Sequence, residues 1–308
     1  MKFSEKKLLV IIPSINGVKA LPTIRSGFSQ SGFRLVTIVI AGKSTRDEAF
    51  LSTLKEEFHD FDVHVATCKN KETVLPGESR NDGTDYAKKT GLTSDYLLFL
   101  DDDIVIPEDY SLILAKFLEK NGSCAVMGRV TSKPVNYWTR AIDYSNFWWL
   151  QMKESVVDRK WLGAGATLMK SKDIANLRFR VNAAINEDVL FFRLLSKKTK
   201  KKLSFCTETG ADHNHSRHNF IEFYRYQFNN GKNGVRFRGN GINIISALKK
   251  ARRNYYMAAR ANNVCLSKTP ALAFGVIMSF LIFQMGIEYG GFLKMHNNFF
   301  RKTKSGLK

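Results

Sequence analysis

The chain has 308 residues, enough for one large domain or two smaller ones, and 44% of them are hydrophobic, which excludes a disordered protein. The net charge of +20 is uneven: residues 1–188 carry 26 Lys and Arg against 24 Asp and Glu, residues 189–242 carry 11 against 3, and residues 243–308 carry 11 against 1. This asymmetry indicates that the C-terminal part meets a polyanionic surface, either nucleic acid or anionic lipid.

The four cysteines lie far apart in the sequence and form no CxxC pair. They predict neither a disulfide framework nor a zinc site, as is typical of a reducing compartment. The N-terminal apolar run at 8–12 stops at Pro13 and is too short for the core of a signal peptide. We therefore expect a protein that is not exported.

Four short apolar runs predict buried strands, at residues 8–12, 35–40, 63–66 and 96–100. The segments between them predict helices, over 18–31, over 45–58 and from about 77 to 89. Because strands and helices alternate over some 100 residues, the pattern predicts right-handed βαβ units and a parallel sheet.

Three carboxylates, Asp101, Asp102 and Asp103, directly follow the strand at 96–100. Alternate residues of a strand face the same way, so Asp101 and Asp103 are expected to share a face at the carboxyl end of the sheet, where ligands bind. One interpretation is a site for a hard divalent ion that holds a diphosphate. The alternative is an acidic turn leading into a helix after Pro107.

Two further segments carry candidate chemistry. Glu187 and Asp188 follow Asn186, and they are either the capped first turn of a helix or the place of a general base. Residues 212–218 hold three of the six histidines, which makes this segment either a solvated polar loop or a source of metal ligands.

Several pieces of sequence occur in one order along the chain: Ile-Pro-Ser-Ile-Asn ending a strand at Asn16, a Ser-Thr-x-Asp turn, Arg-Asn-x-Gly at a helix start, Asp-x-Asp, a glycine-rich stretch over 161–169, and Asn186-Glu187-Asp188. This order resembles that of GT-A fold glycosyltransferases of family 2. The resemblance covers about residues 7–240. It implies an α/β fold, with a mostly parallel, Rossmann-like sheet flanked by helices.

The resemblance also implies roles for particular residues. Asp188 is expected to be the general base of an inverting transfer, and Mn²⁺ or Mg²⁺ is expected to bind a set of aspartates and histidines: Asp101, Asp103, His213 and His215. The nucleotide-diphosphate sugar donor is expected to contact Pro13, Asn16, Arg80, Asp101 and Asp102. Arg80 has a second interpretation, as a surface arginine at a helix start. The acceptor is expected to contact Trp161, Gly163, Gly165 and Glu187.

The sequence departs from the family pattern after the second strand. Many members have an acidic pair there that contacts the nucleotide base, whereas this chain has Ala41-Gly42. The Gln-x-x-Arg-Trp motif of processive synthases is also missing. We therefore expect transfer of a single sugar, of the kind used in bacterial polysaccharide or glycolipid synthesis.

We divide the chain by function into a nucleotide-sugar half at 1–130, an acceptor and catalytic half at 131–240, and a helical membrane-association region at 241–308. Residues 242–261 predict a basic amphipathic helix, and residues 269–287 contain no charge. The second stretch is a marginal membrane span, a re-entrant segment or a buried core helix. These features predict an enzyme at the cytoplasmic face of the cell membrane that acts on a lipid-linked sugar or a glycan.

Two other classes of protein remain as alternatives. The charge and the basic, aromatic stretch over 217–238 would suit a nucleic-acid-binding protein, although we expect no nucleic acid partner, because that class leaves the acidic motifs unexplained. A sugar nucleotidyltransferase would share the fold class, but the N-terminal loop lacks the glycine-rich, lysine-bearing pattern of those enzymes.

Overall fold

The computed structural model describes residues 2–68, 75–174, 176–181, 187–214, 219–234, 244–261 and 270–305. The chain forms two compact units, the first built from residues 1–131 and 153–214 and the second from residues 132–152 and 215–308. This geometric division does not test the three functional segments predicted from the sequence, which stay a prediction.

The first unit contains four parallel strands whose order in the sheet is β3-β2-β1-β4. A short 3-10 turn, η1 (Phe3–Glu5), precedes them. All four predicted strands are present: β1 (Lys7–Pro13), β2 (Leu35–Ala41), β3 (Val63–Ala66) and β4 (Tyr96–Leu100). The sheet positions of β1, β2 and β4 are almost entirely buried, which is why these strands appear in the sequence as continuous apolar runs.

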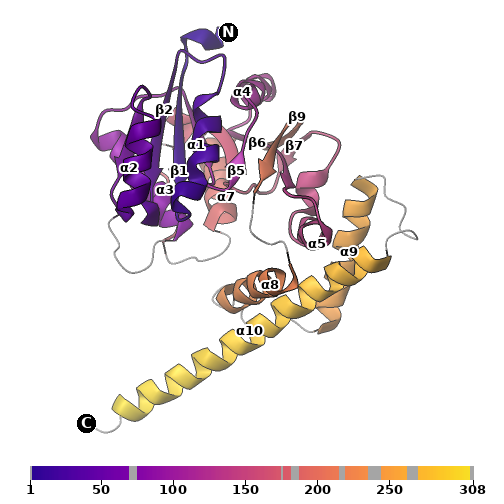
Figure 1. The fold of residues 1–308 in the computed structure, drawn as a ribbon. Coiled ribbons are helices and arrows are strands. Elements are labelled where there is room, and N and C mark those ends of the chain that lie inside the picture. The colour runs from indigo at the N-terminus through magenta and orange to yellow at the C-terminus, as the bar shows by residue number, and fades with distance from the viewer. Residues whose placement is uncertain are drawn as a thin grey trace. The chain divides into compact units, whose positions relative to one another are not determined.

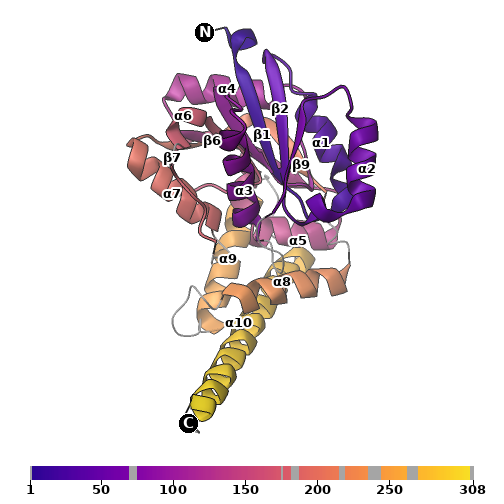
Figure 2. The same cartoon turned by 90° about the vertical axis from the view of Figure 1, so that its left-hand side faces the viewer.

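Helices cover both faces of the parallel strands. The β1–β2 and β2–β3 connections step in one direction across the sheet, so right-handed crossovers place their helices on one face. The β3–β4 connection steps back and places its helix on the other face, as Figure 2 shows. The first two connections hold η2 (Gly17–Ala20) with α1 (Leu21–Phe28), and η3 (Lys43–Arg46) with α2 (Glu48–Glu57); the third holds α3 (Pro76–Lys89).

Beyond β4 the sheet continues with antiparallel pairings, to nine strands in all among the described residues. The order after β4 is β8-β6-β9-β5, and β7 also pairs with β9. The added strands are β5 (Ile104–Val105), β6 (Ala125–Ser132), β7 (Val156–Arg159), β8 (Ala166–Lys170) and β9 (Leu203–His213). The accompanying helices are α4 (Tyr110–Asn121), α6 (Ser171–Ile174) and α7 (Glu187–Thr199). The predicted α/β fold is confirmed, and its antiparallel half places residues far apart in sequence at the end of β4.

The second unit is helical. It consists of α5 (Tyr137–Ser145), η4 (Trp148–Gln151), α8 (Phe220–Gly234), α9 (Ile244–Ala261) and α10 (Pro270–Ser305). The long α10, drawn in yellow in Figure 1, packs on α5, α8 and α9. At Gly231 of α8 a Cβ atom would overlap the carbonyl of Phe283, so glycine permits the close approach of α8 and α10.

One stretch of α10, Pro270–Tyr289, is long and apolar enough to cross a membrane, and half of it is buried inside the protein. It contains the uncharged run predicted as a membrane segment. The core helix of a soluble protein can have the same length and composition, so the choice among a membrane span, a re-entrant segment and a core helix stays a prediction.

Candidate active site

Arg80 joins the two acidic motifs at the carboxyl end of β4. Its Nη2 donates to Asp101 Oδ1 at 2.6 Å, and its Nη1 donates to Glu187 Oε1 at 3.1 Å. The guanidinium also lies 5.3 Å from the ring centroid of Phe179. Arg80 as a whole is 3% exposed, so its interpretation as a surface arginine is wrong. The helix α3 therefore delivers a buried cation to carboxylates that lie 21 and 107 residues away along the chain.

Asp188 lies beside this network at the start of α7. Its Oδ1 accepts a hydrogen bond of 2.7 Å from the backbone N–H of Val189, which fixes the carboxylate at the helix start. A Cβ atom on Gly163 would lie 3.5 Å from Asp188 Oδ2, so the glycine-rich segment runs past this carboxylate. The side chain is thus held in position at the start of α7. Asn186, predicted as the cap of this helix, lies outside the described residues.

Burial and mutual repulsion raise the pKa values of the Glu187–Asp188 pair. Burial and the nearby Asp188 raise the pKa of Glu187, Arg80 acts in the opposite direction, and the net pKa is about 7. Burial also raises the pKa of Asp188, again against the influence of Arg80. Because one guanidinium serves three carboxylates, it does not fully compensate them, and the pair holds a proton at a higher pH than isolated carboxyls would.

Asp103 contacts a different partner. Its Oδ2 lies 3.1 Å from His213 Nε2 at the end of β9, because β5 and β9 pair with Ile104 opposite His213. The expectation that strand alternation orients Asp101 and Asp103 was wrong: β4 ends at Leu100, and a turn follows in which the Ile104 N–H donates to the Asp101 carbonyl. The turn sends Asp101 toward α3 and Asp103 toward β9.

Asp102, the middle carboxylate, supports the loop that follows β1. Its Oδ2 accepts from the backbone N–H groups of Ile15 and Asn16 at 2.8 and 2.9 Å, and its Oδ1 accepts from Asn16 Nδ2 at 2.7 Å. Burial raises the pKa of Asp102. The structure thus brings Asn16 and Asp102 together, as neighbours that hold the loop in shape.

The loops after β1 and β2 are also tied to each other. Ser14 Oγ donates to Ser44 Oγ at 2.9 Å, and the Gly17 N–H donates to the same hydroxyl at 2.9 Å. Gly42 adopts φ +117°, and a Cβ there would lie 2.6 Å from the Ser14 carbonyl oxygen. The sequence departure at Ala41-Gly42 therefore has a structural role, in allowing two loops to touch.

The remaining predicted residues are placed as follows. A Cβ on Gly165 would lie 3.1 Å from Asp101 Oδ2, so this glycine allows the segment to pass Asp101 closely. The guanidinium of Arg159 lies over the ring of Trp161, 5.4 Å from the ring centroid. Pro13 ends β1 opposite Ala41. His215 lies outside the described residues.

Within the described parts of the chain, no group of three or more His, Cys, Asp or Glu side chains is arranged to hold a metal ion. Asp103 and His213 form a pair that could supply two ligands. An oxygen and an imidazole nitrogen suit Mn²⁺, and Mg²⁺ is commonly held by one or two carboxylates together with substrate phosphates. The side chains present therefore fit an ion that binds together with a diphosphate.

Sequence reasoning missed the bridge made by Arg80 and the loop contacts of Ser14, Gly42 and Ser44. The only signal for this bridge in the sequence is that two motifs are rich in carboxylates. If these motifs are buried together, they need a compensating cation. Nothing in the local sequence says that Arg80 supplies it.

The fold and the acidic network together define a GT-A type glycosyltransferase. The sequence profile of Glycosyl transferase family 2 matches residues 9–173, more than half of the chain, and the chain belongs to this family. Among solved structures, residues 1–349 of S. aureus TarS match with a TM-score of 0.53 and 14% identity, over 92% of this chain and 90% of that chain.

The same TarS segment was also solved in complex with UDP and with UDP-GlcNAc. Each of these structures matches with a TM-score of 0.51 over 92% of this chain and 90% of that one, at 16% and 15% identity respectively. A search of curated protein sequences finds no match.

Proposed function

We propose that this chain is an inverting glycosyltransferase that moves one sugar from a nucleotide-diphosphate sugar to a hydroxyl of a lipid-linked sugar or glycan. Membership of family 2 supports glycosyl transfer. The observation that carries the mechanism is the chain of contacts from Asp101 through Arg80 to Glu187, with Asp188 beside it. These contacts bring both acidic motifs to one end of β4.

The donor is assigned to the loops at the carboxyl ends of β1 and β4. TarS, which shares the fold, binds UDP and UDP-GlcNAc, and this supports a nucleotide-sugar donor here. Pro13 and Asn16 border the donor loop, Asp102 holds that loop in shape, and Arg80 fixes the carboxylate of Asp101. Since Arg80 is buried and its two terminal nitrogens already donate to carboxylates, its main contribution is to position Asp101.

Asp103 and His213 would hold Mn²⁺ or Mg²⁺, and Asp101, on the α3 side of the same turn, is the third proposed ligand. Bound there, such an ion would stabilise the negative charge that develops on the departing diphosphate. The chain itself contributes the geometry: pairing of β5 with β9 keeps Asp103 and His213 together, and the ion pair with Arg80 holds Asp101.

Asp188 is the proposed general base, which takes the proton of the acceptor hydroxyl as its oxygen attacks the anomeric carbon. Direct displacement of this kind inverts the anomeric centre. A raised pKa makes a carboxylate a stronger base, and the Val189 N–H fixes its position. Trp161, Gly163, Gly165 and Glu187 are assigned to the acceptor side, and Gly163 lets the backbone pass the base closely.

The enzyme is proposed to work at the cytoplasmic face of the cell membrane, in a peripheral, re-entrant or single-span arrangement. The support is the basic charge of residues 243–308 and the apolar stretch of α10. This location would hold the active site near a lipid-linked acceptor.

A substitution at the base tests the mechanism. Asp188→Asn is expected to bind donor as the wild type does, measured by the thermal shift with UDP-sugars in the presence of Mn²⁺, and to lose transfer activity about 10²- to 10⁴-fold. Glu108→Gln, which changes an exposed carboxylate, is the matched control and should keep both properties. Full transfer activity in Asp188→Asn would refute the assigned base, and the absence of any donor-induced shift in the wild type would refute the donor class.

A further inference from the structure

Helix α9 is a dense source of positive charge. Among its 18 residues it carries five cations and no carboxylate: Lys249, Lys250, Arg252, Arg253 and Arg260. Within the described part of the chain, Arg252 and Arg253 form no ion pair. Because like charges on one helix repel each other, Arg252 and Arg253 indicate an anionic partner outside the chain.

One side of α9 holds the helix in its unit. Ala247, Ala251 and Ala258 are buried against Val276 and Phe280 of α10. Asn254, 3% exposed, donates from Nδ2 to the Ser145 carbonyl at 2.7 Å. Small side chains and one buried hydrogen bond thus fix the orientation of α9, and its cations occupy a defined surface.

The opposite side of α9 combines charge with apolar groups. Ile245, Leu248 and Tyr256 are 59%, 40% and 52% exposed, and Lys249 and Arg252 lie at helical spacing between them. Positions 245, 248, 249, 252 and 256 follow the three- and four-residue spacing of a single helix face. An exposed face of this composition is typical of a helix that lies in the interface of a membrane.

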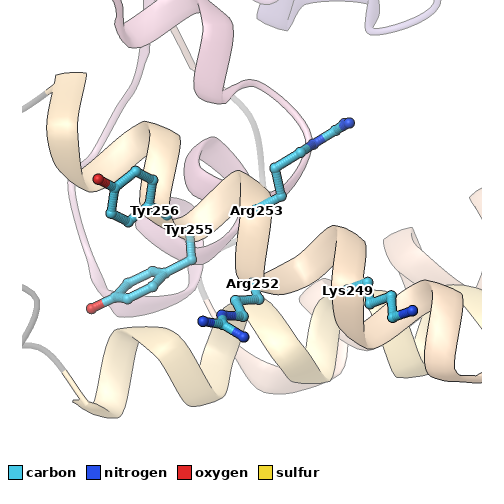
Figure 3. Close-up of a pocket in the computed structure, with 5 residues that line it drawn as sticks. All are labelled: Lys249, Arg252, Arg253, Tyr255 and Tyr256. Atoms are coloured by element: carbon cyan, nitrogen blue, oxygen red, sulfur yellow. The ribbon is translucent and has the colours of Figure 1, made fainter.

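A hollow of about 730 Å³ opens on α9 and is lined by Lys249, Arg252, Arg253, Tyr255 and Tyr256. Figure 3 shows that these five side chains spread over successive turns of the one helix. A guanidinium group can bind a phosphate through two parallel hydrogen bonds. Tyrosine rings favour the boundary between apolar and aqueous regions. The fifth cation is used elsewhere, since Lys250 Nζ lies 5.6 Å from the ring centroid of Phe280.

We infer that the exposed face of α9 is a docking surface for the phosphate headgroups of anionic phospholipids. Nucleic acid would suit the cations and tyrosines, but it offers nothing to cover Ile245 and Leu248, whereas the acyl boundary of a lipid layer does. The neighbouring α10 also exposes apolar side chains, since Phe274, Ile277 and Met285 are 58%, 37% and 53% exposed. The inference rests on the proposed membrane location and does not depend on which sugar is transferred.

The test uses the full chain and vesicles of two compositions, pure phosphatidylcholine and an equal mixture of phosphatidylcholine and phosphatidylglycerol. The wild type is expected to sediment with the mixed vesicles alone. The triple variant Lys249→Ala, Arg252→Ala, Arg253→Ala is expected to bind them about 100-fold more weakly, which corresponds to about 3 kcal/mol for three cations near an anionic surface. Equal binding by wild type and variant would overturn the inference.

A second triple variant is the matched control. Arg193→Ala, Lys197→Ala, Lys198→Ala removes the same charge from exposed positions of α7 and should bind the mixed vesicles as the wild type does. An equal loss in both triple variants would assign the effect to net charge and overturn the inference. The inference would also be overturned if the α9 variant bound single-stranded DNA more weakly than the wild type while its binding to vesicles did not change.

Two further measurements distinguish lipid docking from a folding defect and from an effect on catalysis. Tyr256→Trp is expected to show a blue-shifted emission with mixed vesicles, after subtraction of the signal of the four native tryptophans; no shift would place this face outside the interface. Donor turnover without vesicles should be the same in the α9 triple variant as in the wild type. If the wild type itself turns over no donor, the proposed reaction is refuted, and the vesicle-binding result still tests the docking surface.

Discussion

Arg80 sets the electrostatic character of the site, because one buried guanidinium faces the carboxylates of Asp101, Glu187 and Asp188. Removing such a cation would leave buried charge uncompensated, an arrangement that costs far more than the loss of a surface ion pair. Phe179 closes one side of the guanidinium and stacks on Phe191 at a centroid distance of 4.0 Å. The acidic motifs are thus held by a core contact as well as by charge.

The raised pKa of Glu187 leads to a prediction about stability and pH. In the folded protein the Glu187 carboxyl has a pKa of about 7, whereas the ordinary pKa of a glutamate side chain is 4.5. The contribution of Glu187 to stability is therefore full below about pH 4.5 and is lost as the pH rises through about 7. In Glu187→Gln, which stays neutral, the free energy of unfolding relative to wild type should rise by up to about 3 kcal/mol across this range.

Urea unfolding of both proteins at a series of pH values measures this difference. Comparison with Glu108→Gln, an exposed carboxylate in the same unit, removes the general effect of pH on the chain. Parallel curves for wild type and Glu187→Gln would show that the ion pair with Arg80 compensates Glu187 completely.

The sequence predicts the residue types of the site better than their partners. Two acidic motifs stand out because carboxylates directly follow an apolar run or open a helix. The ion pair between Arg80 and Glu187 spans 107 residues, and the contact between Asp103 and His213 spans 110. Contacts of this range depend on strand pairing, which one sequence does not reveal.

At the scale of elements, the loops after β1 and β2 act as one structure. Ser14 and Ser44 connect them through their hydroxyls, and Asp102 ties the first loop to the end of β4. Gly42 makes the contact possible with a backbone conformation of φ +117° and ψ −164° that is almost restricted to glycine. The shape of the proposed donor loop therefore depends on a residue of the neighbouring strand's loop.

Gly42→Ala is expected to destabilise the first unit by about 3 kcal/mol, because the strained conformation is added to a clash with the Ser14 carbonyl. Gly91→Ala is the matched control, since Gly91 also has positive φ (+72°) but a Cβ there meets nothing within 4 Å. The control should lose only about 1 kcal/mol. Thermal unfolding of both variants measures the difference, and equal losses would mean that the loops separate without cost.

The first four strands and their helices were predictable because each is a buried run or an amphipathic segment with the period of its own structure. The second half of the sheet was less accessible. Its strands pair antiparallel with partners distant in sequence, as β4 does with β8 and β5 with β9. Local patterns indicate that a strand exists, but they carry no information about which strand lies next to it.

At the scale of the whole molecule, positive charge and apolar surface are concentrated in the helical unit. Its charge was readable from the sequence, and the packing of α10 was not. Ser279 Oγ donates to Ser145 Oγ at 2.9 Å, and Tyr137 Oη donates to the Ala271 carbonyl at 2.6 Å. These contacts make the first half of α10 a structural part of the unit rather than an appended anchor.

Two truncations distinguish a structural helix from an anchor. Deleting residues 270–308 should expose the apolar sides of α5, α8 and α9, so that this unit loses its resistance to proteolysis. Deleting only residues 290–308 keeps the contact between Tyr289 and Phe228 and removes five cations: Lys294, Arg301, Lys302, Lys304 and Lys308. The shorter truncation should stay protected from protease and bind anionic vesicles more weakly than the full chain. If the longer truncation stayed equally protected, α10 would contribute nothing to the fold and would serve the membrane alone.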